Sequence, residues 1–408
     1  MEAFNGVIIN KVNGGLVRES DTGDRVVLLV CGATASDKLP NYKPVKFNSI
    51  EALEQLEYSM ETDKSNKELL YYHCSETFRL SPEREMWVIT VPKAIKVSEL
   101  VQSADFLSSI RSIGGVNTIG IAGIAADDSI KTATDNLQLM ADTLREDHLY
   151  IDTIILEGLG TYLSSIAEAS DLRTLDCENV SVVIAQDKDI AGLDSSFSTH
   201  AAVGSALGML SVRYVHENMG SVDIENHPRG AKGTPDYSMV DSKLGRWVNV
   251  GISNGTKLSA VSRADQKTLN EKGYIFAGSF EGYTGVFFSN SHTCVPKTSD
   301  YAYIESNAVW NKAAKLVRNT LIPRVRSVVK ADPSTGYIAT ETVSYWDSLV
   351  RKTLDEMVKA NDISGYDVYI NPKQAAVSEK PFNVQVKMVS NGVVHEFEVD
   401  LGFTNKID

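Results

Sequence analysis

Five near-continuous apolar runs, separated by stretches with helical patterning, limit how this chain can fold more than any other feature. The runs lie at residues 25–31, 86–91, 117–122, 151–156 and 180–185. Consecutive apolar positions are typical of a strand that is buried on both faces. Helices are expected between and after the runs, from about 48, at 66–79, 98–110 and 130–144, and at 200–217. This alternation predicts a mostly parallel sheet with helices on both of its faces.

A break in this pattern divides the chain of 408 residues. Between about residues 221 and 255, Gly, Pro, Ser and Asp are frequent, which indicates irregular structure and a domain seam. Two short strands, at 273–277 and 285–289, and two amphipathic helices follow. One helix begins near residue 306 and carries Trp310, Ala313, Val317 and Leu321 on one face. The other covers about 344–360, with Trp346, Val350, Leu354 and Met357 at similar spacing.

The end of the chain carries the clearest local signal. Residues 381–390 and 393–401 largely alternate between apolar and polar, with Asn391-Gly392 between them. Asn-Gly favours a two-residue type I′ turn, which predicts a β-hairpin of fixed register. That register pairs Val386 with Phe397, Val384 with Val399 and Phe382 with Leu401, and it places Lys387 opposite Glu396. Because a two-stranded ribbon is marginal alone, we expect it to gain further strands or a packing partner.

Together these patterns predict an α/β protein whose mostly parallel sheet is followed by a smaller α+β C-terminal domain ending in a β-hairpin, with extended terminal arms. The expected divisions are an N-terminal arm at 1–22, an outer α/β domain at 23–255, a C-terminal domain at 256–380, and a hairpin with its arm at 381–408.

Residue patterns typical of catalysis or of metal binding are few. The chain has no GxxxxGK[ST] phosphate loop, no HExxH and no GxSxG, and its seven histidines are scattered. Gly120 to Gly123 and Gly158 to Gly160 do not complete GxGxxG, so we interpret them as tight turns. We expect no catalytic residues, no metal site, no cofactor and no enzymatic activity.

Charge and cysteine content narrow the class of protein further. The net charge of −13 disfavours binding to nucleic acid, because an acidic surface repels phosphates. The four cysteines, Cys31, Cys74, Cys177 and Cys294, form no CxxC pair, which favours buried, reduced thiols. The sequence shows neither a secretory signal pattern nor an apolar run long enough to cross a bilayer, so we expect folding in the cytoplasm without membrane insertion.

A basic concentration stands out in this acidic chain, at Lys312, Lys315, Arg318, Arg324, Arg326 and Lys330. One interpretation is the solvated face of a helix. The other is an electrostatic contact with an acidic neighbour, which could be another copy of the chain.

The order of several segments resembles contractile tail sheath proteins, in particular the divergent sheath-like family of bacteroidete phages and prophages. Near the N-terminus these segments are Gly6-Val-Ile-Ile, the apolar strand with its small residues at 26–33, and the capped helix that begins Asn48-Ser-Ile-Glu-Ala-Leu. Later ones are residues 258–273, Tyr301-Ala-Tyr-Ile followed by a basic helix, and residues 363–370 before the terminal β module. The match is degenerate within each segment but covers most of the chain.

This resemblance implies a structural subunit that stacks as hexameric rings around an inner tube protein and contracts to drive the tube through a target envelope. The implied partners are further copies of this chain, the inner tube protein, and baseplate and terminator proteins. The implied location is a phage tail or a phage-tail-like particle. The strands exchanged between subunits would involve Val7, Ile8, Ile9, Val12, Phe382, Val384, Val386, Val394, Phe397 and Val399. Candidate contacts to a neighbouring subunit or to the tube are Lys312, Lys315, Arg318 and Arg324.

Two alternatives stay open at this point. The parallel-sheet pattern is compatible with an α/β enzyme that has an unrecognised active site. Another tail or baseplate structural protein is the second alternative.

Overall fold

The computed structural model describes residues 24–82, 84–222, 238–376, 381–399 and 401–403. The predicted N-terminal arm, with Val7, Ile8, Ile9 and Val12, lies outside the described residues.

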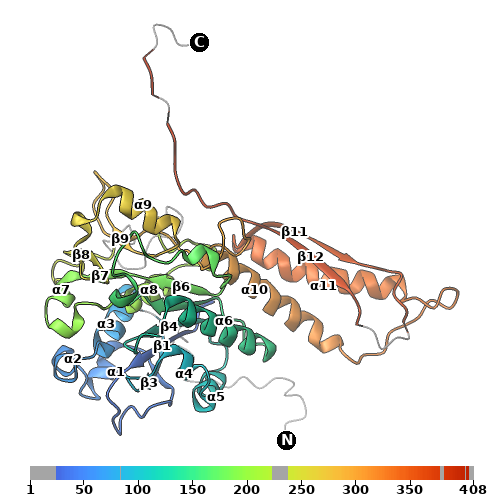
Figure 1. The fold of residues 1–408 in the computed structure, drawn as a ribbon. Coiled ribbons are helices and arrows are strands. Elements are labelled where there is room, and N and C mark those ends of the chain that lie inside the picture. The colour runs from blue at the N-terminus through green and yellow to red at the C-terminus, as the bar shows by residue number, and fades with distance from the viewer. Residues whose placement is uncertain (1–23, 83, 223–237, 377–380, 400, 404–408) are drawn as a thin grey trace, which may run out of the picture.

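A six-stranded sheet forms the centre of the protein, in the order β2-β3-β1-β4-β5-β6 (Figure 1). Five strands are parallel, and β2 at the edge runs antiparallel to β3. Every residue of β1, β4, β5 and β6 is buried. The bounds are β1 Val27–Gly32, β2 Val45–Phe47, β3 Met86–Val91, β4 Thr118–Ala122, β5 Thr153–Glu157 and β6 Val180–Val183. The five apolar runs therefore form the predicted parallel sheet.

Helices cover both faces of this sheet, as predicted (Figure 1). Side chains of β1 alternate between two apolar cores, with Leu28 and Val30 in one and Val27 and Leu29 in the other. The first core is closed by α4 Val97–Leu100, α5 Ala104–Ile113 and α6 Ile130–Glu146, and the second by α3 Leu70–Leu80 and α8 Val203–Ser211.

Glycines let α8 lie unusually close to α3. A Cβ atom at Gly204 would stand 2.2 Å from the carbonyl oxygen of His73, and one at Gly208 would stand 2.9 Å from that of Thr77. Any larger residue there would push the two helices apart, so these glycines set the thickness of this layer.

Smaller elements complete this part of the chain, which we call the body (the described residues from 24 to 303). They are α1 Ile50–Glu54, α2 Met60–Asn66, β7 Ala185–Asp187, α7 Lys188–Ala191, β8 Val250–Ile252, α9 Arg263–Glu271, β9 Ala277–Gly278 and β10 Phe287–Phe288, with 3-10 turns η1 Gly160–Tyr162, η2 Leu172–Thr174, η3 Ser195–Phe197 and η4 Leu258–Ala260. Leu269, Tyr274 and Phe276 join the first core. The expected domain division at residue 255 stays a prediction.

The remaining elements form a projection from the body, the C-terminal module, at residues 304–390 (Figure 1). It consists of α10 Ile304–Leu321, η5 Ile322–Arg324, α11 Thr340–Lys359, β11 Ile363–Ile370 and β12 Val384–Ser390. Trp346, Val350, Leu354 and Met357 are buried on one face of α11, as predicted. On α10, Ala313, Val317 and Leu321 pack in the core of the module, whereas Trp310 is 38% exposed and its ring makes an edge-to-face contact with Tyr150.

Candidate assembly surface

The first helix of the C-terminal module, α10, also packs on the body, so no flexible link separates the two parts. Its first half meets the body through polar side chains: Asn311 Nδ2 donates to Asp152 Oδ1 over 2.9 Å, and Asn307 Nδ2 donates to the carbonyl oxygen of Glu178 over 2.7 Å. Its second half packs apolar side chains into the core of the module. Sequence reasoning missed this polar face, although Asn307 and Asn311 recur at the helical spacing of Ile304 and Ala308.

Lys312, the first of the predicted contact residues, is engaged within the chain. Its Nζ atom lies 2.5 Å from Asp24 Oδ2 and 2.7 Å from Asp362 Oδ2. Burial would raise the pKa of Asp362, but hydrogen bonds from His216 and Lys312 hold it below its ordinary value. The ion pairs therefore fix Asp24, where the described chain begins, beside α10. A contact of Lys312 with a neighbouring subunit stays a prediction.

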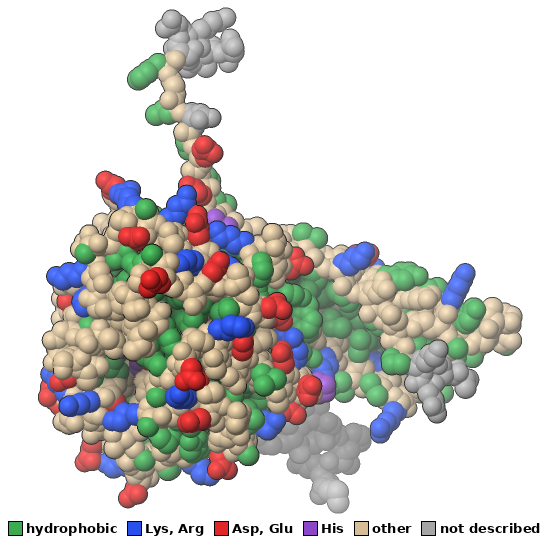
Figure 2. Space-filling view, in the orientation of Figure 1, with side chains coloured by type: hydrophobic (Ala, Val, Ile, Leu, Met, Phe, Trp, Pro, Cys, Tyr) green, Lys and Arg blue, Asp and Glu red, His purple; other side chains and the backbone are tan. Residues whose placement is uncertain are grey.

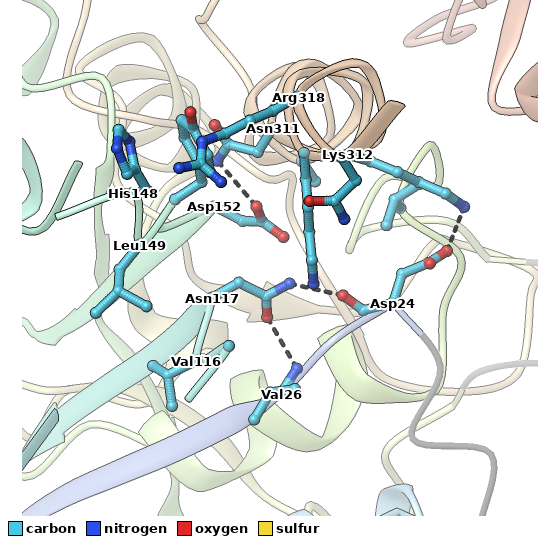
Figure 3. A pocket seen from close by; sticks show the side chains of 16 residues that line it. Asp24, Val26, Val116, Asn117, His148, Leu149, Asp152, Asn311, Lys312 and Arg318 are labelled. Carbon is cyan, nitrogen blue, oxygen red and sulfur yellow. Dashed lines mark hydrogen bonds and ion pairs between the residues drawn. The ribbon is translucent and has the colours of Figure 1, made fainter. Parts of the chain in front are cut away.

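One turn further along α10, Lys315 and Arg318 line a pocket of about 310 Å³ between this helix and the strand ends of the body (Figure 3). Val116 and Leu149 lie on the body side of the pocket. Neither Lys315 nor Arg318 forms an ion pair with a described residue. The structure thus brings three of the four predicted cations, Lys312, Lys315 and Arg318, to one place.

The fourth predicted cation, Arg324, lies apart from the pocket, beyond the end of α10. Its guanidinium donates to the carbonyl oxygen of Thr320 over 3.1 Å and to the Tyr345 hydroxyl over 3.2 Å. The adjoining segment exposes Ile322, Val325 and Val328, the last of them by 99%. This end of the module is therefore both basic and apolar.

The two strands of the module form an antiparallel ribbon whose pairing differs from the predicted hairpin. Val386 lies opposite Val368, Val384 opposite Ile370, and Lys387 opposite Asp367. The described residues 391–399 and 401–403 form no strand, so the predicted pairing of residues 382, 384, 386 and 387 with residues 401, 399, 397 and 396 is wrong. The predicted C-terminal antiparallel hairpin is confirmed, but β11 and β12 form it.

We attribute the pairing of β12 with β11 to the apolar surface that the two strands bury together. The inward side chains of β11 and β12 lie in one core with the apolar face of α11, which an isolated hairpin could not provide. The Asn391 side chain serves as an anchor rather than as a turn residue. It accepts a hydrogen bond from the Ser364 hydroxyl and donates one to the carbonyl oxygen of Asn361.

Beyond the ribbon, the C-terminal tail (described residues 391–399 and 401–403) runs away from the module as an extended segment (Figure 1). Figure 2 shows apolar side chains along it. Phe397 is 82% exposed, Val399 77% and Leu401 95%. Close to its root the tail touches the body, where the ring of His395 stacks on Tyr303 at 4.8 Å.

The outer edges of the ribbon are not paired with any strand of the described chain. Unpaired edges offer main-chain donors and acceptors to another strand. An open ribbon and an exposed apolar tail thus occur together in one module. Of the predicted strand residues, Val384 and Val386 lie in the ribbon, and Val394, Phe397 and Val399 lie in the tail.

The carboxyl ends of the parallel strands, where open α/β sheets place their ligands, are filled by the protein itself. The Glu157 carboxylate accepts hydrogen bonds from the backbone N–H of Gly123 over 2.6 Å and of Ala201 over 2.8 Å. Burial raises the pKa of this carboxyl to about 7, although both donors favour the ionised form. At these strand ends an internal carboxylate, and not a bound ligand, therefore accepts hydrogen bonds from the backbone N–H groups of Gly123 and Ala201.

The described residues contain no cluster of three His, Cys, Asp or Glu side chains arranged to hold a metal ion. Among the described helices, none combines the length and apolar character needed to cross a membrane.

Several solved structures with a similar fold are contractile sheath proteins. A chain of the helical sheath of the anti-feeding prophage in the contracted state matches with a TM-score of 0.59 and 14% identity, covering 100% of both chains. The contracted sheath complex of an extracellular contractile injection system, PVC, gives 0.59 and 11%, covering 100% of this chain and 99% of that one. A sheath tail protein from Listeria innocua gives 0.51 and 10%, covering 90% and 95%.

Family models cover almost the whole sequence, whereas no curated protein matches it. The model described as the DUF2586 N-terminal domain matches residues 4–292, and the DUF2586 C-terminal domain matches residues 300–408. The protein therefore has the fold of contractile sheath proteins and belongs to the DUF2586 family.

Proposed function

We propose that this protein is the structural subunit of a contractile sheath, polymerising as stacked hexameric rings around an inner tube and contracting to drive the tube through a target envelope. The observation that carries this proposal is the similarity of the chain, body and C-terminal module together, to chains of two contracted sheaths, those of the anti-feeding prophage and of the extracellular contractile injection system PVC. A similarity confined to the body would be shared by many α/β proteins. Because the module and its open ribbon are included, an assembly role is favoured over an enzymatic one.

Subunits would be joined by exchanged strands. The tail of one copy, and the N-terminal segment at about Val7 to Val12, would add to the open ribbon of a neighbour. An added strand of about seven residues forms roughly six main-chain hydrogen bonds, worth about 3–9 kcal/mol in total at 0.5–1.5 kcal/mol each. Alternation in the tail would place Phe397, Val399 and Leu401 on one face, next to the apolar side of the ribbon.

The inner tube would meet the C-terminal module. Arg324 and the exposed Ile322, Val325 and Val328 support this, because a basic and apolar end suits an acidic partner surface. Baseplate and terminator proteins would contact the outermost rings, and one matching chain does come from an anti-feeding prophage baseplate. The net charge of −13 supports a role without nucleic acid. Folding and assembly would take place in the cytoplasm.

Negative-stain electron microscopy of the purified chain tests the proposal. Cylinders or stacked rings are expected as the protein concentration rises. Deleting residues 1–19 should leave a folded protein that no longer polymerises. Monomers that persist at high concentration would argue against the sheath role, and normal cylinders from the deletion variant would exclude the N-terminal strand exchange alone.

A further inference from the structure

Two of the four cysteines face each other across neighbouring segments of the body. Cys177, between η2 and β6, and Cys294, between β10 and α10, form an antiparallel bridge. The N–H of Cys177 donates to the carbonyl oxygen of Cys294 over 2.9 Å, and the N–H of Cys294 donates back over 3.2 Å. Side chains of directly opposed residues project to the same side. Both thiols are free, and both lie in the first core.

This arrangement fits the reach of a disulfide. A hydrogen-bonded antiparallel pair has its Cα atoms about 5.5 Å apart, inside the range of about 4.4–6.8 Å that a disulfide spans. Its Cβ atoms stand up to about 5.5 Å apart, wider than the roughly 3.5–4.5 Å of a relaxed disulfide. Closing the bond would therefore strain the bridge and leave the bond easy to reduce.

We propose that Cys177 and Cys294 are a redox modification site, at which a peroxide converts the two thiols of the folded protein into a reversible disulfide. The first thiol reacts with hydrogen peroxide to give a sulfenic acid and one water. The second thiol then attacks that sulfur, forming the S–S bond and releasing a second water. Each thiol loses one hydrogen, and the peroxide oxygens leave as the two waters.

The bond would tie down the segment that leads into α10. This segment is already held by Arg173, whose Nη1 atom lies 3.2–3.3 Å from the carbonyl oxygens of Thr293, Val295 and Ala302. A Cys177–Cys294 bond would add a covalent link between the start of β6 and the root of the C-terminal module. Because the bond would close a long loop in the unfolded chain, oxidised protein should melt at a higher temperature than reduced protein, by less than an unstrained disulfide would give.

The environment of Cys177 sets the rate of the reaction. Its Sγ atom lies 3.6 Å from Asp135 Oδ1. Burial, followed by the nearby Asp135 carboxylate, raises the pKa of the Cys177 thiol to about 12, and burial raises the pKa of Cys294 as well. Because the thiolate is the reactive form, oxidation of the folded protein should be slow, and Asp135→Asn should accelerate it.

The test treats the intact, folded chain with hydrogen peroxide and counts thiols after denaturation. Four thiols should fall to two, a non-reduced peptide map should link Cys177 to Cys294, and dithiothreitol should restore all four. Cys177→Ser should keep its three thiols. Cys74→Ser, the matched control in the other core, should lose two of its three.

Two outcomes would overturn the proposal. One is that all four thiols survive an exposure that fully oxidises the unfolded chain. The other is that thiols disappear without a peptide linking Cys177 and Cys294, for instance through a bond between Cys31 and Cys74. Near-ultraviolet circular dichroism of each variant, compared with the unmodified protein, establishes that the core is intact.

Discussion

Exposed apolar residues of the C-terminal tail allow the strand-exchange model to be tested without disturbing the fold. In the isolated chain Phe397 is 82% exposed and Leu401 is 95% exposed. Replacing both by serine should therefore change the free energy of unfolding of the monomer by less than about 0.5 kcal/mol. If the tail is buried against a neighbouring subunit, however, both side chains lose their contacts in the polymer.

The size of that loss follows from the burial of the two side chains. Fully burying a Phe or Leu side chain is worth about 1.5–3 kcal/mol, so the double variant should weaken each subunit contact by about 3–6 kcal/mol. Since 1.4 kcal/mol corresponds to a factor of ten, the association constant should fall by roughly two to four orders of magnitude.

Sedimentation of polymer over a series of protein concentrations measures this effect as a rise in the concentration at which polymer first forms. The matched control is Glu396→Ser with Glu398→Ser, which changes the alternate face of the same extended segment and should polymerise as the unmodified chain does. If the Phe397→Ser, Leu401→Ser variant polymerised at the unmodified concentration, the tail could not be an exchanged strand that buries this face.

Three further predictions concern stability: that of the Lys312 ion pairs, of the buried Glu157 in the body, and of the core of the C-terminal module. Lys312→Met should lower the free energy of unfolding by about 1.5–3 kcal/mol, because the buried carboxylate of Asp362 would lose its lysine partner. The control Lys315→Met should change the free energy of unfolding by less than about 0.5 kcal/mol, and denaturant titration measures both variants. The pKa of Glu157 is raised by burial from 4.5 to about 7, so its contribution to stability is complete below pH 4.5 and is lost as the pH rises through 7. Glu157→Gln should therefore remove up to about 3 kcal/mol of the fall in unfolding free energy between pH 4.5 and 7, and an unchanged pH slope would refute this assignment. Trp346→Ala should cost about 3–5 kcal/mol through the cavity left in the module, measured as a lower denaturation midpoint.

The parallel strands of the sheet could be predicted because each of them is a run of mostly apolar residues, which is visible in the local sequence. Consecutive apolar residues at 27–32 and 118–122 need no knowledge of their partners to indicate burial on both faces. The short edge strand Val45–Phe47 was not predicted, because only Phe47 is buried and its antiparallel pairing with β3 depends on distant residues. The order of the strands likewise depends on contacts between segments far apart in the sequence.

The failed hairpin shows the limit of a strong local signal. Asn391-Gly392 suits a tight turn, but turn chemistry contributes little beside the apolar surface that β12 buries with β11 and α11. The candidate site was limited in the same way. Its basic residues were identified from sequence, whereas the pairing of Lys312 with Asp24 joins residues 288 positions apart.

The loop between α11 and β11 lies close to Asp24, where the described chain begins, and to Asn391, where the C-terminal tail begins. Asp362 binds Lys312, which binds Asp24 at the start of the described chain, and the neighbouring Asn361 carbonyl accepts a hydrogen bond from Asn391 at the start of the tail. Asp24 and Asn391 therefore both lie close to this one short loop, beside the ribbon that would receive the exchanged strands. Because α10 connects this corner to the body without a flexible link, a rotation of the body would carry the tail root, the N-terminal root and the ribbon together. Such a rigid connection would keep the starting points of both donated segments and the receiving ribbon of one subunit in fixed relative positions when subunits reorient.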